Sequence, residues 1–189
     1  MKEIEILVEV YSSVDEVLKA LDKFEYLGNK ETIDTYYYDP FRNNLKPNSS
    51  NQINECLRLR TKDNINSITY KVDQFDENEK WLYSDEYETT VEDIFMVAKI
   101  FNKLGFRKLL TIHNNKRTYK YNDYEIVFEV VKDLGYFIEV EYCTDENIDI
   151  KAKKDEIQKF INSLGLNVSD ELNVGKPEMM INKLNIKID

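Results

Sequence analysis

The first ten residues, MKEIEILVEV (residues 1–10), alternate between apolar and mostly acidic side chains. Successive side chains of a β-strand point to opposite faces, so this period of two predicts a strand with one apolar and one acidic face. A single leucine, Leu7, interrupts the acidic row. The apolar face would carry Ile4, Ile6, Val8 and Val10, and the other face would carry Glu3, Glu5, Leu7 and Glu9. The chain therefore begins with a strand that presents one side to a core and collects carboxylates on the other.

Seven further segments repeat this period of two and combine β-branched or aromatic residues with charges. Basic side chains share a face in the middle of the chain, in CLRLRTK (residues 56–62) and ITYKVD (residues 68–73). Acidic side chains share a face near its end, in YEIVFEVV (residues 124–131) and FIEVEY (residues 137–142). The predicted strands are Glu3–Tyr11, Glu31–Tyr38, Glu55–Lys62, Ser67–Asp73, Leu82–Thr90, Lys108–Tyr119, Tyr124–Val131 and Tyr136–Cys143. Eight strands of this length can close into a barrel.

Three segments have the caps and apolar stripes of amphipathic helices, over residues 12–28, 91–105 and 151–165. The first of them has a serine cap and is expected to end at Gly28. A short final helix is expected to begin at Pro177. Residues 40–54 are polar and contain prolines, which predicts a long mobile loop.

The composition limits the classes of protein to which the chain can belong. With 189 residues, 42% hydrophobic and 33% charged, it suits one globular domain spanning residues 1–189. No apolar run is long enough to cross a bilayer and no signal-peptide pattern is present, so we expect no membrane partner and a cytoplasmic location. Cys56 and Cys143 are expected to be reduced. A net charge of −10 argues against nonspecific binding to nucleic acid. A homodimer is compatible with the sequence, although no stripe specifies one.

Two arrangements explain the charged strand faces. A one-sided sheet would expose them to water, where opposite charges form weak pairs of ~0–1 kcal/mol. The alternative is an α+β fold, in which an eight-stranded antiparallel β-barrel forms a tunnel with a polar, charged lumen and the helices pack on the outside. An interior with charges of both signs is costly unless a ligand satisfies them. Carboxylates suit Mg²⁺ or Mn²⁺ and basic side chains suit phosphate oxygens, so such a tunnel would fit a metal-bound polyphosphate.

The ordered series of motifs resembles the CYTH superfamily, the triphosphate tunnel metalloenzymes that include class IV adenylyl cyclases and thiamine triphosphatases. The family's E-x-E-x-K signature is matched by EIEIL (residues 3–7), and family-like LRLR (57–60), TYK (69–71) and EYE (86–88) follow in order. Near the end, FEVVKDLGYFIEVE (128–141) resembles the family's acidic strand and the motif after it. The resemblance covers nearly the whole chain, with the motifs in the family's order.

The resemblance implies a tunnel that binds a triphosphate with one or two Mg²⁺ or Mn²⁺ ions. The implied metal ligands are Glu3, Glu5, Glu129, Glu139 and Glu141. The implied phosphate-binding residues are Arg58, Arg60, Lys71 and either Lys116 or Arg117, because a one-residue slip of the strand would exchange the last two. Glu5, Lys71 and Lys116 are the implied catalytic residues, and Glu86 and Glu88 are further tunnel residues.

Two positions depart from the family pattern. Leu7 stands in place of the signature lysine, and Asn114 stands where another family lysine is expected. Losing a contact to a buried phosphate can cost several kcal/mol of transition-state stabilisation, or roughly a hundredfold in rate. The reaction favoured by the sequence is hydrolysis of a triphosphate, such as tripolyphosphate or a nucleoside or thiamine triphosphate. A cyclase that makes cyclic AMP from ATP, or a noncatalytic polyphosphate- or nucleotide-binding domain, remains the alternative.

Overall fold

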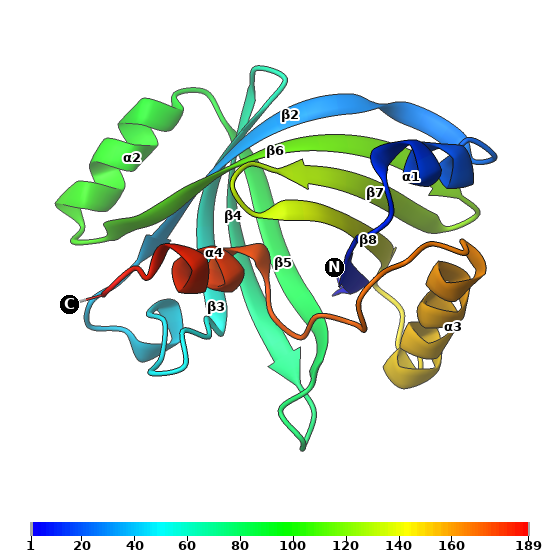
Figure 1. Cartoon of the computed structure of the whole chain (residues 1–189). Helices are drawn as coiled ribbons and strands as arrows, with labels where there is room; N and C mark the ends of the chain where they lie inside the picture. Colours follow the sequence, from blue (N-terminus) through cyan, green and yellow to red (C-terminus); the bar gives the residue numbers. More distant parts are fainter. Residues whose placement is uncertain (1, 189) are drawn as a thin grey trace.

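A computed structural model describes residues 2–188, and its eight antiparallel strands form a closed barrel in the order β1-β5-β4-β3-β2-β6-β7-β8 (Figure 1). The strands are β1 Lys2–Glu9, β2 Glu25–Tyr38, β3 Glu55–Lys62, β4 Ile65–Phe75, β5 Trp81–Val91, β6 Arg107–Tyr121, β7 Tyr124–Val131 and β8 Gly135–Thr144. The helices are α1 Val14–Leu21, α2 Ile94–Lys103, α3 Ile150–Ser163 and α4 Lys176–Leu184, with a short 3₁₀ turn, η1, over Asn43–Leu45. The predicted α+β barrel with accompanying helices is confirmed.

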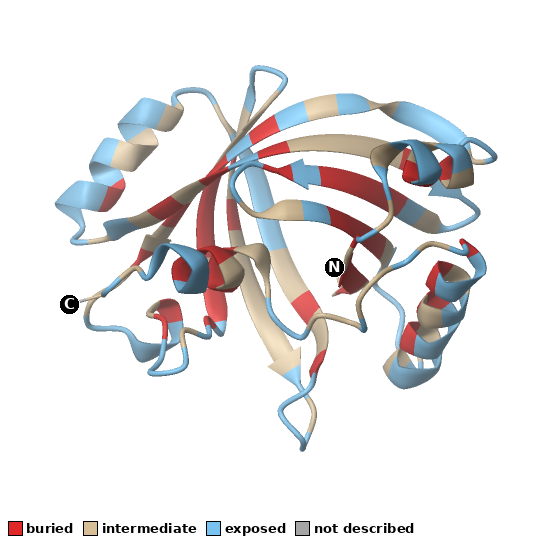
Figure 2. Ribbon diagram, in the orientation of Figure 1, coloured by how far each residue is buried: buried red, intermediate tan, exposed pale blue. Residues whose placement is uncertain are grey.

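The apolar faces of the strands point outward, where helices cover them. Ile4 and Ile6 of β1 are buried in one cluster with Leu21 of α1 and with Ile157 and Ile161 of α3. In Figure 2 the sides of α1 and α3 that meet the barrel are buried and their outer sides are exposed. A second cluster joins α2 to the outer face of β3 in the same way. Because alternate residues of a strand face opposite ways, this outward apolar packing turns the charged faces into the barrel.

Helix α4 packs against a different surface. Met180 and Ile181 are buried together with Leu7, Tyr36 and Phe137, in a cluster distinct from the ones that hold the other helices. Leu7 and Tyr36 also line the barrel's cavity, as do residues at the start of α4. The leucine that interrupts the acidic row of β1 is therefore part of an apolar surface inside the tunnel on which α4 rests.

The segment before α4, residues 166–175, runs along β1. Ser169 N–H donates to the Glu9 carbonyl at 2.9 Å, and Leu172 N–H donates to the Leu7 carbonyl at 2.8 Å. The ladder between β1 and β5 covers Lys2 and Glu3 of β1, opposite Asp85 and Ser84. The segment thus continues the hydrogen bonding of β1 beyond the short ladder that closes the barrel. We call residues 166–175 the strap.

The first helix is shorter than predicted. It starts as expected, with the Ser13 side chain and Glu16 forming a capping box, but it ends at Leu21 rather than near Gly28. Residues from Glu25 onward instead extend β2 and pair with β6, with a register shift between Tyr26 and Gly28. Pairing with a distant strand overrides the local helical pattern there.

The loop over residues 40–54 is more structured than expected. It contains η1, and its residues Leu45 and Ile53 are buried. Ile53 N–H also donates to the carboxylate of Glu178 at 3.3 Å, which ties the loop to α4.

Among residues 2–188, no helix combines the length and apolar character that a membrane crossing requires.

Candidate functional site

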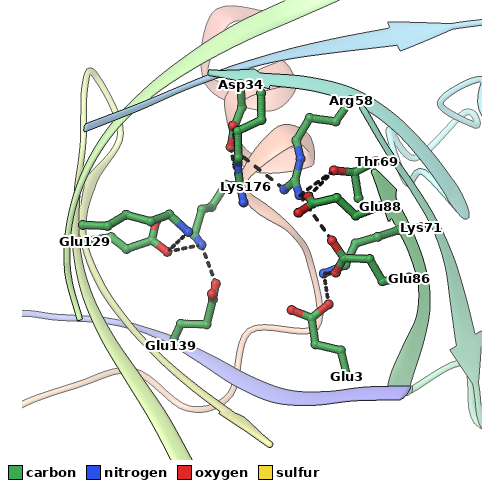
Figure 3. A network of polar contacts seen from close by, with 12 residues as sticks. Glu3, Asp34, Arg58, Thr69, Lys71, Glu86, Glu88, Glu129, Glu139 and Lys176 are labelled. Carbon is green, nitrogen blue, oxygen red and sulfur yellow. Dashed lines mark hydrogen bonds and ion pairs between the residues drawn. The ribbon is translucent and has the colours of Figure 1, made fainter. Parts of the chain in front are cut away.

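The barrel encloses a cavity of about 210 Å³ with charged side chains of both signs on its walls. Its acidic residues are Glu3, Glu5, Asp34, Asp73, Glu86, Glu125, Glu139, Glu141 and Glu178, and its basic residues are Arg58, Arg60, Lys62, Lys71, Lys116 and Lys176. Figure 3 shows how groups from opposite walls point toward one another. Nine acidic residues face six basic ones, so the walls are net negative when all are ionised.

Three carboxylates form the strongest candidate metal site. Glu3 and Glu5 lie on β1, and Glu141 of β8 is directly opposite Glu5 in the ladder. One oxygen from each lies within 4.8 Å of the other two. Burial raises the pKa of Glu5 well above its usual value, and burial together with the Glu3 charge raises the pKa of Glu141 to about 8. Such crowded carboxylates call for a cation between them, and oxygen ligands of this kind suit Mg²⁺ or Mn²⁺.

Lys71 of β4 lies beside this trio. Its Nζ is 2.6 Å from Oε2 of Glu3 and 3.5 Å from Oε2 of Glu86. Burial favours the protonated form of Glu3, but the Lys71 ammonium outweighs this effect and lowers the pKa of Glu3 to about 2. Burial and a hydrogen bond shared with Glu3 raise the pKa of Glu86 to about 7. A fixed positive charge therefore stands at the edge of the candidate metal site.

Two arginines of β3 form the basic wall. Arg60 donates from Nε and Nη2 to the two carboxylate oxygens of Asp34, both at 2.7 Å. Arg58 donates from Nη2 to the Thr69 hydroxyl at 3.2 Å and to Oε1 of Glu86 at 3.5 Å. Burial alone would raise the pKa of Asp34, but the hydrogen bonds from Arg60 and the Arg58 charge hold it well below its usual range. Asp34 thus positions both guanidinium groups.

The first residue of α4, Lys176, reaches into the tunnel. Its Nζ lies 2.8 Å from Oε1 of Glu129 and 2.5 Å from Oε2 of Glu139, as Figure 3 shows. Lys116 of β6 contacts the same Glu129 oxygen at 2.9 Å. Burial would lower the pKa of Lys176, but Glu129 and Glu139 raise it far above its usual value. Glu139 is directly opposite Leu7 in the β1–β8 ladder, so Lys176 brings a cation close to the position that lacks the signature lysine.

The structure separates the predicted metal ligands into two groups. Glu3, Glu5 and Glu141 are together, whereas Glu129 and Glu139 are paired with lysines, and Glu129 is fully buried behind them. A divalent ion would therefore find its oxygen ligands most directly in the first group.

The structure also settles the register of β6. Lys116 faces the cavity, whereas the Arg117 guanidinium lies 6.0 Å from the centre of the Tyr26 ring and Arg117 is absent from the cavity walls. The geometry therefore gives no support to the expectation that Arg117 binds phosphate. Asn114 is buried in the wall near Lys116 and adds no charge.

Glu86 lines the cavity, while Glu88 is not among the residues of its walls. Glu88 accepts a hydrogen bond from the Thr69 hydroxyl at 2.7 Å and its side chain is half exposed. Glu86 and Glu88 are two residues apart on β5, so their side chains share a face, as the sequence predicted. Both point toward Arg58 of the basic wall.

Sequence reasoning missed Lys176 and Asp34. Asp34 could have been found, because it alternates with Thr32 and Tyr36 along β2 and so shares their face. Lys176 had no comparable signal. Pro177 marks the start of a helix, but nothing local places that helix against the inside of a barrel.

Comparison with known proteins agrees with this geometry. The CYTH domain model matches residues 1–173. A curated protein of Methanocaldococcus jannaschii named "Putative adenylate cyclase MJ0240" is 29% identical over 167 residues, which cover 88% of this chain and 92% of that protein. The structure of PH1819 from Pyrococcus horikoshii OT3 is 25% identical, with a TM-score of 0.79 and coverage of 95% of this chain and 99% of that one.

A more distant structure shares the fold. It is a Hippeastrum protein, HpAC1, described as a "Putative adenylyl cyclase" with a dominant triphosphatase activity. It has a TM-score of 0.62 at 14% identity, over 98% of this chain and 97% of that one.

Proposed function

This chain belongs to the CYTH family, and on that premise we propose that it is a metal-dependent triphosphatase that hydrolyses a triphosphate held inside the barrel. One observation carries the proposal. The carboxylates Glu3, Glu5 and Glu141 share a single cavity with the arginine and lysine side chains that suit phosphate oxygens. Phosphoryl transfer needs positioning and charge neutralisation more than a covalent nucleophile, and this cavity contains groups for both.

Divalent cations fit both the donor set and the charge balance of the cavity. Glu3, Glu5 and Glu141 are the residues that would hold Mg²⁺ or Mn²⁺. Without a cation the net negative walls would repel a triphosphate. When bound, the ion neutralises phosphate charge and polarises the phosphoryl oxygens. We therefore expect triphosphate binding to require the metal.

The basic residues would bind the phosphate chain. Arg58, Arg60 and Lys71 come from β3 and β4, and Lys116 comes from β6. Each is already paired with a carboxylate, so its side chain is held in place before a substrate enters. Phosphate oxygens would replace part of these contacts. Such prearranged charges favour the negative charge of the transition state without the cost of reorienting them.

Lys176 supports a catalytic reading over one of binding alone. The loss of a lysine at position 7 argued for weak turnover, but Lys176 provides a second source of positive charge beside Glu139. Lys176 thereby supplies one of the two cations that Leu7 and Asn114 leave out. The C-terminal helix would take part in the reaction as well as in closing the tunnel.

Hydrolysis is favoured over cyclisation because it makes fewer demands on the site. A cyclase must seat a nucleoside so that its ribose hydroxyl attacks the α-phosphorus, whereas hydrolysis requires a water at the terminal phosphorus. The charged residues named above serve either reaction. The products therefore distinguish the two.

The test is an assay of the purified chain with Mg²⁺ or Mn²⁺ and with tripolyphosphate, ATP or thiamine triphosphate. Release of orthophosphate that needs the metal is the expected result. Glu5→Gln and Arg58→Ala should lose it, while Arg117→Ala, on the outer face, should retain it. Pyrophosphate and cyclic AMP from ATP would instead identify a cyclase. Tight binding with no product above buffer controls would reject catalysis.

A further inference from the structure

Helix α2 packs on the barrel through a narrow face. Phe101 is its buried residue, and Ile94, Val97 and Ala98 pack beside it in the cluster that reaches the outer face of β3. In Figures 1 and 2, α2 stands on the other side of the molecule from α1 and α3, and most of its ribbon has the colour of exposed residues. The rest of the described chain, residues 2–188, therefore leaves much of this helix uncovered.

The uncovered side of α2 carries a second apolar stripe. Met96, Ile100 and Leu104 are spaced four residues apart, so they follow one another along one side of the helix. Phe95, beside Met96 in the first turn, adds a fourth apolar side chain. The exposed fraction of these four residues runs from 49% for Ile100 to 78% for Phe95. We call them the α2 patch. Single exposed apolar residues are ordinary, whereas a group of this kind marks an interaction surface.

The helices on the other side of the barrel lack such a patch. No large apolar residue of α1 or α3 is exposed. The exposed residues of α1 are Asp15, Glu16 and Lys19, and those of α3 are charged, amide or small residues. An apolar outer side is therefore particular to α2 among these three helices.

Charges of opposite sign lie at the two ends of the α2 patch. Glu92 and Asp93 precede the helix, and Lys103, Arg107 and Lys108 lie at its C-terminal end. All five are exposed, and none of them forms an ion pair with another residue of the range 2–188. A matching partner therefore has an apolar centre, a basic group at one end and an acidic group at the other.

A second copy of α2, turned antiparallel, has this arrangement. In a twofold dimer every contact occurs twice, with the roles of the two copies exchanged. An axis near Ile100 sets Met96 of one copy beside Leu104 of the other, because each is four residues from Ile100. The same rotation sets the acidic start of each helix beside the basic end of the other. The α2 patch is thus complementary to itself in both hydrophobicity and charge.

We propose that two copies of this chain form a homodimer in which their α2 helices pack antiparallel through the α2 patch. The apolar stripe supplies the affinity, and the charges at its ends fix the orientation. One short helix from each copy gives an interface at the small end of the range for specific complexes, so the dimer dissociates on dilution into the micromolar range. The sequence by itself does not single out this surface, because only the packing of α2 shows which of its apolar residues stay exposed.

A lipid surface is the other partner that apolar residues beside lysines can fit. The net charge of −10 opposes binding to anionic lipids, and a membrane offers nothing to the acidic end of the α2 patch. A second copy satisfies both ends. The observations therefore favour the dimer.

The α2 patch is separate from the tunnel. None of residues 92–108 lines the cavity. Each barrel keeps its own site in the dimer, so the dimer and the proposed hydrolysis are tested independently of each other.

The test is sedimentation velocity of the purified chain over a series of micromolar concentrations. The sedimentation coefficient should rise from that of a monomer to that of a dimer. Ile100→Glu should weaken association at least tenfold, because two carboxylates would then meet at the twofold axis. The start of β2, which Figure 1 places near α1, supplies the matched control Leu27→Glu, since Leu27 is 47% exposed and should leave association unchanged. Thermal unfolding checks that both variants fold.

A charge exchange tests the antiparallel orientation. Lys103→Glu should weaken the dimer about fivefold, because an exposed ion pair is lost at both ends of the interface. Adding Glu92→Lys should restore the association, which damage to the fold would not do. A monomer at every concentration, or equal association of Ile100→Glu and the wild type, would overturn the proposal. If that monomer sediments with vesicles of phosphatidylserine and phosphatidylcholine, the α2 patch binds lipid instead of a second copy.

Discussion

Lys176 and Glu139 form an ion pair of 2.5 Å, and Glu139 is directly opposite Leu7 in the β1–β8 ladder. The positive charge that β1 lacks at position 7 is therefore brought to the same part of the tunnel by α4. Leu7 itself packs with Met180 and Ile181 of that helix. The leucine and the lysine thus belong to one arrangement, in which an apolar contact seats the helix and the first helical residue carries the charge.

Replacing Lys176 by Met should lower kcat/KM for triphosphate hydrolysis by roughly a hundredfold, because a cation that faces the phosphate site is lost. Steady-state assays with Mg²⁺ measure the effect. Thermal unfolding of the same variant shows whether the barrel still folds after Glu139 loses its partner.

A second substitution checks the placement of this charge. Leu7→Lys in the Lys176→Met background should recover part of the lost activity, since it puts a cation opposite Glu139. Lys183→Met, at the exposed end of α4, is the matched control and should keep wild-type activity. Full activity of Lys176→Met would contradict the assignment.

The candidate metal site predicts different outcomes for two groups of carboxylates. Glu5→Gln and Glu141→Gln should each weaken Mn²⁺ binding by at least tenfold, because each removes one charged ligand from the trio. Glu129→Gln should leave Mn²⁺ affinity within about threefold of wild type, since Glu129 is paired with Lys116 and Lys176. Isothermal titration calorimetry measures all three.

Removing the metal should lower the free energy of unfolding of the wild type more than that of Glu5→Gln. At an Mn²⁺ concentration of about one hundred times Kd, binding should stabilise the wild-type fold by about 2.7 kcal/mol, and Glu5→Gln should lose most of that gain. Without metal, Glu5→Gln should be at least as stable as wild type, because it relieves a buried acidic group. A Glu129 variant that loses Mn²⁺ binding as fully as Glu5→Gln would refute the division into two groups.

Asp34→Asn should destabilise the barrel by about 3 kcal/mol, because it leaves the buried Arg60 guanidinium without its charged partner. Urea unfolding measures the loss. A small change, below about 0.5 kcal/mol, would show that solvent already satisfies Arg60. If the variant folds, its KM for triphosphate should rise, since Asp34 no longer positions Arg58 and Arg60.

Period-two alternation predicted the strands and the face of each that carries charge, and the resemblance to the CYTH family favoured closing them into a barrel with that face inside. MKEIEILVEV shows why, since every second residue from Ile4 to Val10 is buried on the outer side, and Glu3, Glu5 and Leu7 line the cavity. A sheet with one apolar and one charged face can bury the apolar side under helices and close around the other, but the same alternation also allows an open sheet with its charged face in water.

The features that escaped prediction depend on distant pairing. Residues 25–28 join β2 because β6 is beside them, and the choice of Lys116 over Arg117 follows from the register of those two strands. Lys176 enters the tunnel because Leu7, Tyr36 and Phe137 form a surface for α4, and these three residues lie far from it in the sequence. No local pattern contains that information.

The buried Glu178 predicts a pH-dependent contribution to stability. Burial raises its pKa to about 7, above the ordinary value of 4.5, so the folded state holds the proton more tightly than the unfolded chain. The stability from this group is complete below about pH 4.5 and is lost as the pH rises through 7. Glu178→Gln stays neutral, so it should match wild type at pH 4 and exceed its stability by up to about 3 kcal/mol at pH 8.5.

Urea unfolding at pH 4, 6 and 8.5 measures the Glu178→Gln difference at each point. The exposed Glu77 of the β4–β5 turn supplies a matched control, because Glu77→Gln should change stability by less than about 0.5 kcal/mol at every pH. A Glu178→Gln variant less stable than wild type at pH 8.5 would mean that the fold holds Glu178 as a carboxylate. Its hydrogen bond from Ile53 N–H would then be the dominant contact, and α4 would be fastened to residues 40–54 by a charged group instead of a neutral one.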